Sequence, residues 1–393
     1  MRISELSAYH VRIPLRRTIR HASHTRTETD TLIVNCRLSD GTEGWGEGLP
    51  RQYVTGETIE TVFDVLRATD WGAQLGGGLE GLPDAISLCD RVRLSGVPDG
   101  ARDCFGNSLR CALEISLLDA VTRTLGTPLS AVTSQLPEAA GIRGKVDQVR
   151  YSATITSMGA LKSVIRAWTY RYYGFQQFKV KVGVAGVNDA AAVRRIRWAA
   201  GRAVDLRIDA NEAWTCDNLE SKLAPLLPYG ISSLEQPVPH ADVDGLAAVR
   251  KRITTPIMLD ESVCSLNDAH RAIERGTCDL FNIRLSKCGG FVNSLRLAAE
   301  ARRAGLGYQL GCQVGETGIL SAAGRHFASS VVDLKYLEGS YDRYLVAERL
   351  TVEDLTFGRG GYAPALAGPG LGVEIDRKAV RRVTVDEEHM RIS

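Results

Sequence analysis

The chain lacks several features that would define its class. It has no apolar run long enough to cross a bilayer, and its first ten residues contain no apolar signal core. Its nine cysteines include no Cys-x-x-Cys pair, which disfavours both a disulfide framework and a zinc site. The net charge is only +2 without a basic stripe, so nothing favours a nucleic-acid or membrane partner. We therefore expect a cytoplasmic protein with reduced thiols.

The sequence pattern of the first part of the chain is typical of a small α+β domain. Residues 1–66 carry β-branched runs, and Gly44-Trp-Gly-Glu-Gly48 is interpreted as turn chemistry. Residues 58–135 favour helices, and the clearest, at 107–120, has a wide apolar face with Asn107 as its expected N-terminal cap. Residues 1–135 are therefore predicted to form a capping domain. The Gly- and Pro-rich end of the chain, 360–393, is predicted to return to it.

The middle of the chain, residues 136–359, alternates between strands and helices. Seven helical stretches separate the eight expected strands, which fits a closed parallel α/β barrel better than an open sheet. With 393 residues, one such domain plus a smaller one is the natural division. The expected strands are 149–156, 175–182, 205–210, 231–235, 256–260, 279–285, 307–312 and 334–338.

One charged residue marks the end of each of five successive strands. They are Lys181, Asp209, Glu235, Asp260 and Lys287, which follow one another at steps of 28, 26, 25 and 27 residues. Each step is the length of one strand, one helix and two turns. A parallel barrel builds its active site from the loops that follow its strands, so these side chains are expected to converge.

The three carboxylates, Asp209, Glu235 and Asp260, come from neighbouring strands. Carboxylates that converge in a buried place without counter-charges repel one another strongly. A hard divalent cation removes this repulsion, and ligands that are all oxygen favour Mg²⁺ over zinc. Three separate salt bridges or helix caps are the alternative, which the regular spacing disfavours.

The lysines are placed for proton transfer. Side chains alternate along a strand, so Lys179 and Lys181 both point into the barrel mouth. Lys287 follows a strand four places further round a ring of eight, and is therefore expected on the opposite side. A metal-bound carboxylate with a lysine on each face suits removal of the proton beside that carboxylate.

These motifs together resemble the enolase superfamily, in its muconate-lactonizing-enzyme subgroup. The resemblance covers nearly the whole chain, through the Lys-x-Lys at 179–181, Asp260-Glu-Ser262 and Lys287-Cys-Gly-Gly290. It implies a modified (β/α)7β TIM barrel under an α+β cap, Mg²⁺ as cofactor, and an enediolate intermediate. The implied roles are Lys181 and Lys287 as the acid/base pair, Lys179 as their assistant, Asp209, Glu235 and Asp260 as metal ligands, and Asn211 and Glu261 as supporting residues. No histidine ends the seventh strand, which separates the chain from mandelate-racemase-like members.

The reaction and substrate stay open at this point. Tyr53-Val-Thr-Gly-Glu57 looks like the cap loop of dipeptide epimerases, yet their Asp-x-Asp after the eighth strand is replaced by Glu338-Gly-Ser340. We expect racemisation or epimerisation of an amino-acid derivative or dipeptide. Cycloisomerisation or dehydration of a carboxylate and a non-catalytic metabolite-binding barrel are the alternatives. The expected partners are a small carboxylate substrate and further copies of the chain in a homo-oligomer. The candidate substrate contacts are His24, Arg51, Tyr53, Glu316 and Glu338.

Overall fold

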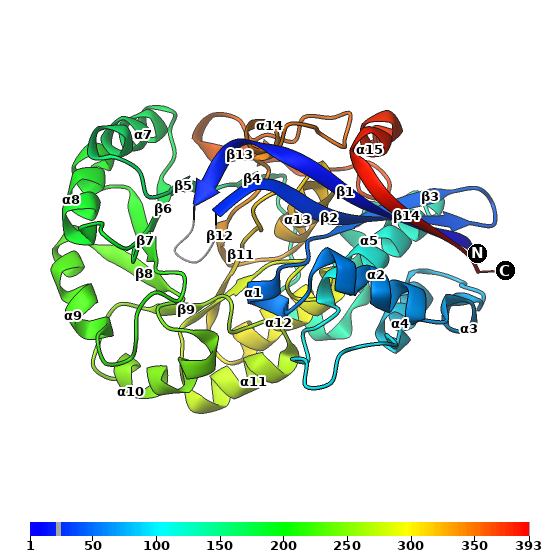
Figure 1. The fold of residues 1–393 in the computed structure, drawn as a ribbon, viewed down its shortest axis with the longest axis horizontal. Helices are drawn as coiled ribbons and strands as arrows, with labels where there is room; N and C mark the ends of the chain where they lie inside the picture. The colour runs from blue at the N-terminus through cyan, green and yellow to red at the C-terminus, as the bar shows by residue number, and fades with distance from the viewer. Residues whose placement is uncertain (21–24, 393) are drawn as a thin grey trace.

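The computed structural model describes residues 1–20 and 25–392, and their centre is an eight-stranded parallel sheet (Figure 1). Its strands run in the order β12-β11-β10-β9-β8-β7-β6-β5, so each strand pairs with its neighbour in the sequence. The Ser152 backbone N–H, beside β5, donates to the Leu337 carbonyl at the end of β12, 2.8 Å away, and so joins the sheet's two ends. The strands are β5 (Ala153–Ile155), β6 (Gln177–Lys181), β7 (Asp205–Asp209), β8 (Ile231–Glu235), β9 (Ile257–Leu259), β10 (Leu280–Ile283), β11 (Gly307–Leu310) and β12 (Leu334–Leu337).

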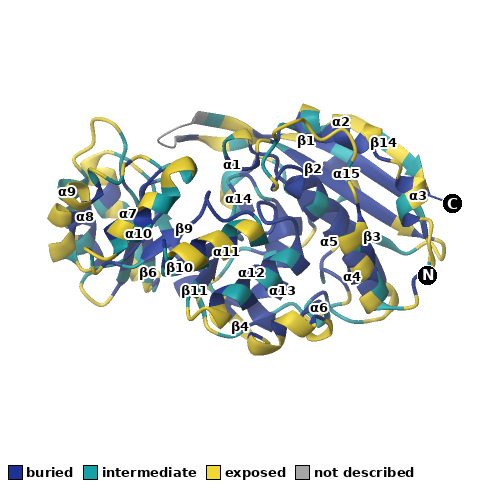
Figure 2. Cartoon of the chain, turned by 90° about the horizontal axis from the view of Figure 1, so that it is seen from below, coloured by how far each residue is buried: buried dark blue, intermediate teal, exposed yellow. Residues whose placement is uncertain are grey.

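Helices connect the strands and cover the outside of the barrel, where Figure 2 shows exposed faces over a buried interior. Each crossover places a helix against the outer face of the sheet, as right-handed βαβ units do. The predicted α/β barrel with its antiparallel cap is therefore confirmed. The connecting elements are α7 (Ala160–Tyr172), α8 (Asp189–Ala200), α9 (Leu219–Leu223), η2 (Ala224–Tyr229), η3 (His240–Gly245), α10 (Leu246–Arg250), α11 (Leu266–Arg275), α12 (Phe291–Arg303) and α13 (Gly318–Ser330).

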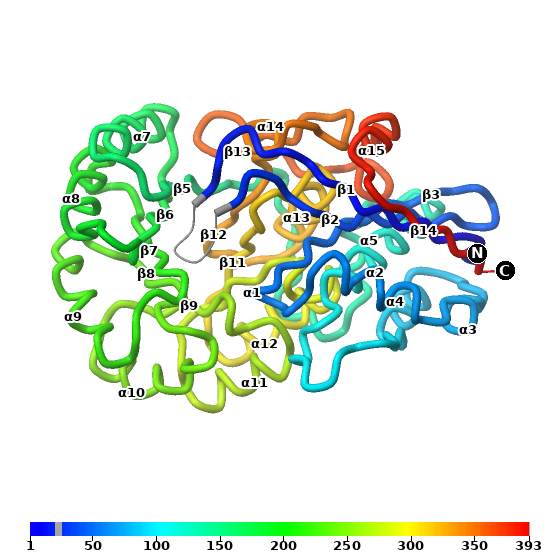
Figure 3. The backbone as a smooth tube through the Cα atoms, viewed as in Figure 1, coloured from blue at the N-terminus to red at the C-terminus, as the bar shows by residue number. Residues whose placement is uncertain are grey.

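A second, antiparallel sheet in the order β14-β1-β2-β3 lies beside the barrel. We call this sheet and helices α1–α5 the cap. Both termini lie at its far end, because β14 from the end of the chain pairs with β1 (Figure 3). The cap consists of β1 (Ile3–Arg20), β2 (Thr25–Leu38), β3 (Glu43–Gly48), α1 (Gln52–Thr55), α2 (Ile59–Ala68), α3 (Trp71–Leu75), α4 (Leu82–Arg91), α5 (Asn107–Thr124) and β14 (Thr384–Arg391).

The remaining elements are short. They are α6 (Ala131–Gln135), η1 (Pro137–Gly141), β4 (Gln148–Arg150), α14 (Asp342–Leu345), η4 (Arg359–Gly361), β13 (Tyr362–Pro364) and α15 (Arg377–Val383). β4 pairs with β13, so residues from the two predicted domain boundaries meet in one small sheet. The exact boundaries at 135 and 360 stay a prediction. In the ranges that the structure describes, no helix is long and apolar enough to cross a membrane.

The glycine-rich stretch 44–48 is a strand, so its interpretation as a turn is wrong. Gly44, Gly46 and Gly48 alternate along β3 and face α5, where an added Cβ would lie 2.1, 1.9 and 2.0 Å from helix carbonyl oxygens. Alternation by two is strand periodicity, and glycine here lets a helix backbone approach the sheet closely. Local composition could not show this contact, because the partner carbonyls lie 60 to 72 residues further along the chain.

The start of α5 also differs from expectation. Gly106, with φ of 88°, occupies the N-cap position, and Asn107 is the first helical residue. The Asn107 side chain instead leaves the helix and donates from Nδ2 to the carbonyls of Cys264 and Lys287, at 2.9 and 2.8 Å. The prediction that Asn107 caps α5 is therefore wrong, because a contact between the cap and the barrel takes its amide.

Two buried glutamates of the cap receive hydrogen bonds from the first turns of barrel helices. Glu47 accepts from the backbone N–H groups of Thr317 and Leu320, at 2.8 and 2.9 Å, where α13 begins. Glu114 accepts from the Val292 N–H, 2.9 Å away, in the first turn of α12. Burial raises the pKa of each to about 7 despite these donors. The unpaired N–H groups and the positive end of the helix dipole favour a hydrogen-bond acceptor at the start of a helix. The cap therefore supplies the carboxylate acceptors for the first turns of α12 and α13.

Candidate active site

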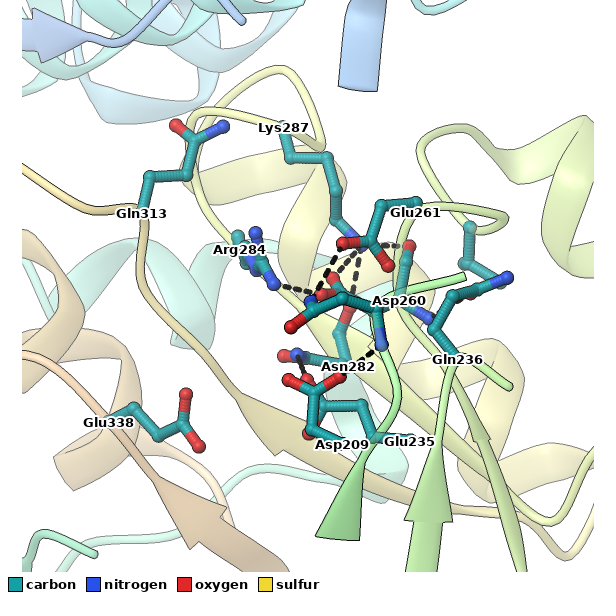
Figure 4. Close-up of polar contacts among 12 residues, drawn as sticks. Asp209, Glu235, Gln236, Asp260, Glu261, Asn282, Arg284, Lys287, Gln313 and Glu338 are labelled. Carbon is teal, nitrogen blue, oxygen red and sulfur yellow. Dashed lines mark hydrogen bonds and ion pairs between the residues drawn. The ribbon is translucent and has the colours of Figure 1, made fainter. Parts of the chain in front are cut away.

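The predicted charged residues meet at the carboxyl edge of the barrel. Lys181, Asp209 and Glu235 are the last residues of β6, β7 and β8, and they are paired in register across these neighbouring strands. Asp260 directly follows β9, and Lys287 lies four residues beyond β10. The three carboxylates have no solvent exposure at all. Figure 4 shows them stacked towards one another, with Lys287 above.

Lys181 is joined to a chain of polar groups that ends at Glu261. Its Nζ donates to Asp209 Oδ2 and to Asn211 Oδ1, both at 2.6 Å. Asn211 in turn donates from Nδ2 to Glu261 Oε1, 3.4 Å away. Burial, and then the nearby Asp209 and Glu212 charges, raise the pKa of Glu261 to about 7. Asn211 has a φ of 42°, in the left-handed region that asparagine enters more readily than most other residues.

Lys179 lies deeper, among three carboxylates. Its Nζ is 2.7 Å from Glu338 Oε2, 3.2 Å from Glu235 Oε1 and 3.6 Å from Asp209 Oδ2. Burial alone would lower the pKa of Lys179, but these negative charges outweigh it and raise the pKa above its usual value. Lys179 is therefore held as a fixed cation, whose charge offsets part of the carboxylate repulsion.

Lys287 lies across the site and is completely buried. Its Nζ donates to the carbonyl of Asp260 at 2.5 Å and to that of Asn282 at 2.8 Å, and it lies 3.1 Å from Asp260 Oδ1. Its own carbonyl accepts from Asn107 of the cap. Lys181 and Lys287 therefore occupy opposite sides of the carboxylate cluster, but only Lys181 lies on the wall of the adjoining cavity.

Asp260 is positioned by residues that the sequence did not single out. Arg284 donates to Asp260 Oδ2, and Gln236 Oε1 accepts from the Asp260 N–H at 2.8 Å (Figure 4). Gln236 also donates to Ser262 Oγ, 2.6 Å away, and has a φ of 32°. Gln236 was visible in the Leu234-Glu-Gln-Pro237 motif, but only the folded structure shows that it holds the loop after β9 in place.

The donor set suits a hard cation such as Mg²⁺. Three buried carboxylates lie on adjacent strands, and Glu235 Oε2 has no hydrogen-bond partner among the described residues. An orphaned buried oxygen of this kind calls for a ligand. In the two described ranges no group of three His, Cys, Asp or Glu side chains stands ready as a ligand set. The three carboxylates do not form such a set because Asp209 accepts a hydrogen bond from Lys181, and Asp260 accepts one from Arg284.

A cavity of about 200 Å³ opens beside these groups. Its polar wall holds Lys179, Lys181, Arg284 and Glu338. Asn211, Glu212 and Glu261 extend this polar wall. Apolar and aromatic residues from both the barrel and the cap line another part of the cavity. These lining residues are Ile19 and Tyr53 from the cap, and Tyr170, Phe175, Tyr341, Leu345 and Phe357 from the barrel side. One half of the cavity therefore suits a charged group and the other an apolar one.

The five candidate substrate contacts fall in different places. Tyr53 and Glu338 line the cavity. Arg51 is buried and does not, because its guanidinium donates to Thr29 Oγ1 and to the Val314 carbonyl, both at 2.9 Å, between cap and barrel. Glu316 is likewise absent from the cavity wall, and its Oε1 accepts from the Gln313 N–H at 2.6 Å. His24 lies outside the described residues.

Glu338 was expected to contact the substrate, but in the structure it is bound by other side chains. Besides Lys179, it accepts from Arg207, a completely buried guanidinium that also lies 4.2 Å from the Tyr336 ring centroid. Arg207 was missed in the sequence, although it precedes Asp209 by two positions and so shares its strand face. Two cations therefore occupy the Glu338 carboxylate. Ser340 is also engaged, because its hydroxyl donates to Tyr151 Oη at 2.8 Å.

Comparisons with known proteins agree with this geometry. The family model described as Enolase C-terminal domain-like matches residues 162–379. A hydrophobic dipeptide epimerase of Enterococcus faecalis is 31% identical over 84% of this chain and 88% of its own length. An N-succinyl-L-Arg/Lys racemase of Bacillus cereus is 27% identical over the full length of both chains.

Solved structures give the same result. The crystal structure of the Bacillus cereus racemase superposes with a TM-score of 0.87 over the whole of both chains, at 25% identity. A dipeptide epimerase from Cytophaga hutchinsonii, complexed with Mg and the dipeptide D-Ala-L-Val, gives a TM-score of 0.85 over both complete chains, at 26% identity.

Proposed function

Because the chain belongs to the enolase superfamily, we propose that it is an isomerase that removes and returns the proton alpha to a carboxylate. The reaction is racemisation or epimerisation of an amino-acid derivative or a dipeptide. The observation that carries this proposal is that Lys181 contacts Asp209, at one end of the row of three buried carboxylates, and Lys287 contacts Asp260, at the other end. A base on each face is what stereochemical inversion at one carbon requires.

We assign the metal site to Asp209, Glu235 and Asp260, with Mg²⁺ as the cation. When bound, the cation supplies the positive charge that stabilises an enediolate. The support is the all-oxygen donor set and the partnerless Glu235 Oε2. Arg284 and Lys181 donate to two of these carboxylates, Asp260 and Asp209, whose remaining lone pairs would be available to a cation.

The other side chains bind, hold or move the proton. Lys181 is the base on the cavity side, and Asn211 orients its amine by the 2.6 Å hydrogen bond. Lys287 serves the opposite face, and it must exchange its carbonyl partners for the substrate to do so. Lys179 keeps its charge throughout, since its surroundings raise its pKa. Glu261 contacts Asn211 and so acts through it.

The substrate is small and carries an apolar group beside its carboxylate. The aromatic half of the cavity supports the apolar group, and the lysines support the carboxylate. Lys179 and Arg207 both occupy Glu338, so a free ammonium would meet Glu212 or Glu261, the other carboxylates of the cavity wall. Both an amino-acid derivative and a dipeptide are therefore retained as the substrate class.

Isotope exchange tests the proposal. Pools of dipeptides, N-acyl amino acids, hydroxy acids and amino acids are incubated with the enzyme and Mg²⁺ in D₂O and followed by NMR. A substrate should lose its α-proton signal and racemise, and EDTA should stop both. A product that is only a ring or an alkene would instead establish the alternative, a cycloisomerase or dehydratase. Binding without metal-dependent exchange would establish a non-catalytic barrel.

Two variants separate the roles of the lysines. Lys181→Met should abolish exchange from one enantiomer and Lys287→Met exchange from the other. Lys251→Met, at an exposed position, is the matched control and should leave both unchanged. In a cycloisomerase, Lys287→Met would keep all α-proton exchange. The homo-oligomer and the cytoplasmic location stay predictions, which sedimentation and cell fractionation would test.

A further inference from the structure

We propose that Cys104 and Cys264 form a site of reversible oxidation, at which a peroxide converts two thiols into a disulfide between the cap and the barrel. Cys104 lies in the turn before α5, and Cys264 lies in the loop after β9. Both side chains are completely buried, and they pack against each other in a small cluster with Val54 and Tyr53. Both are free thiols, and the Cys264 Sγ lies 3.4 Å from the Glu261 carbonyl. Nearly 160 residues separate the two cysteines in the sequence, so their spacing could not have predicted that they meet.

The surroundings make one thiol the better nucleophile. The neighbouring Cys264 thiol, together with the nearby Arg102 charge, lowers the pKa of the Cys104 thiol despite its burial. A thiolate, rather than a thiol, attacks a peroxide. The Cys104 thiolate takes one oxygen atom, which gives a sulfenic acid and releases hydroxide. The Cys264 thiol then attacks that sulfur, so the S–S bond forms and the oxygen leaves as water.

A cavity reaches Cys264, one member of this pair. This cavity of about 460 Å³ lies between the cap and the barrel and is also bordered by Asp103, the neighbour of Cys104. Arg93, Arg110 and Arg296 also line it. Hydrogen peroxide is small enough to enter, whereas a protein disulfide is not. The site is therefore a target for peroxide rather than for exchange with another protein.

The bond would join two segments that shape the active site. Cys264 lies four residues after Asp260, and its carbonyl shares the Asn107 amide with the carbonyl of Lys287. On the cap side, Arg102 donates to the carbonyl of Val54 in α1, 2.8 Å away. α1 also carries Tyr53, which lines the cavity beside Lys181. Oxidation would thus fasten α1 to the loop of Asp260.

Mapping of the linked peptides tests the inference without any need for activity. The full-length protein is treated with hydrogen peroxide, blocked with N-ethylmaleimide and digested at acid pH. Mass spectrometry should find the peptides of Cys104 and Cys264 joined, and the count of free thiols in denaturant should fall from nine to seven. Linkage of any other pair, or no loss of thiols, would overturn the inference.

Stability gives a second readout. A disulfide that closes so long a loop should raise the thermal midpoint by roughly 5 °C, and dithiothreitol should reverse the shift. Cys104→Ser and Cys264→Ser should each abolish the linkage and the shift. Cys288→Ser is the matched control, because Cys288 borders the same cavity but its Sγ lies 3.8 Å from the Val263 carbonyl. If a single variant folds poorly, the peptide map of the unmodified chain still decides.

Discussion

Replacement of Glu338 by Gln removes one charge from a buried network and keeps its shape. Glu338 is 8% exposed, and it accepts from Lys179 and from Arg207, which are 3% and 0% exposed. Lys179 keeps Glu235 and Asp209 as further partners, whereas Arg207 loses its carboxylate. Arg207 would retain Ser152 Oγ, at 3.2 Å, the face of Tyr336 and at most the uncharged carbonyl oxygen of the glutamine. The substitution therefore leaves a guanidinium buried without an opposite charge.

The expected cost follows from this burial. Removal of one partner from a buried ion pair costs about 3–5 kcal/mol, whereas an exposed pair is worth about 0–1 kcal/mol. The direction of the Glu338 pKa shift agrees with this stabilising ion pair. Burial alone would raise the pKa of Glu338, but the Lys179 and Arg207 charges outweigh it and lower the pKa to about 2. Because the folded pKa is depressed, the stabilisation is complete at neutral pH. It is lost as the pH falls from the usual glutamate pKa, about 4.3, towards 2.

Urea unfolding at pH 7 measures the effect. We expect Glu338→Gln to lower the free energy of unfolding by about 3–5 kcal/mol, and to flatten the fall in stability below pH 4.3. The control is Asp354→Asn, which removes the exposed ion pair with Arg343 and should cost less than about 1 kcal/mol. Equal losses in the two variants would refute the reasoning, since burial would then carry no penalty.

Three further substitutions test other parts of the structure. Gly46→Ala places a Cβ 1.9 Å from a carbonyl of α5 and should cost about 3 kcal/mol or more in urea unfolding, whereas Gly77→Ala, which meets nothing within 4 Å, should be neutral. Asn107→Ala leaves the Lys287 carbonyl without its cap donor, so stability should fall by about 1–3 kcal/mol and the Lys287-dependent exchange should slow; an unchanged exchange rate would contradict that link. Burial lowers the pKa of His326 to about 4, so the unfolded state gains its proton first and stability is lost from pH 6.5 down to 4. His326→Gln should reduce that loss by about 3 kcal/mol, and parallel curves would argue against it.

The sequence predicted those features whose causes are local. The strand ends at Lys181, Asp209, Glu235 and Asp260 follow from periodicity, because alternation assigns a face and the crossover length assigns the next strand. The fold class follows from the same repeat. The apolar half of the cavity could not be predicted, since its walls combine residues as distant as Tyr53 and Phe357.

The errors and omissions share one physical origin, which is a partner far away in the sequence. Gly46 has strand periodicity, but only the docking of α5 explains why it lacks a side chain. Asn107 is a good helix cap by type, yet a carbonyl 180 residues away takes its amide. Arginine usually lies on the surface, so no signal in the sequence indicated that Arg207 and Arg284 are buried. Their burial depends on the carboxylates of Glu338 and Asp260, which lie beside them only in the folded chain.

The two cap glutamates that meet α12 and α13 have a consequence for how such a protein can diverge. Glu47 and Glu114 complete helices that follow the sixth and seventh barrel strands, so those turns are finished only when both halves of the chain are present. The two halves therefore cannot be exchanged independently between relatives without leaving buried N–H groups unpaired. Variation costs less at positions that line the cavity, such as Tyr53 in α1 and Ile19 at the end of β1. New specificities can arise there, while the anchoring glutamates keep the two halves inherited as one unit.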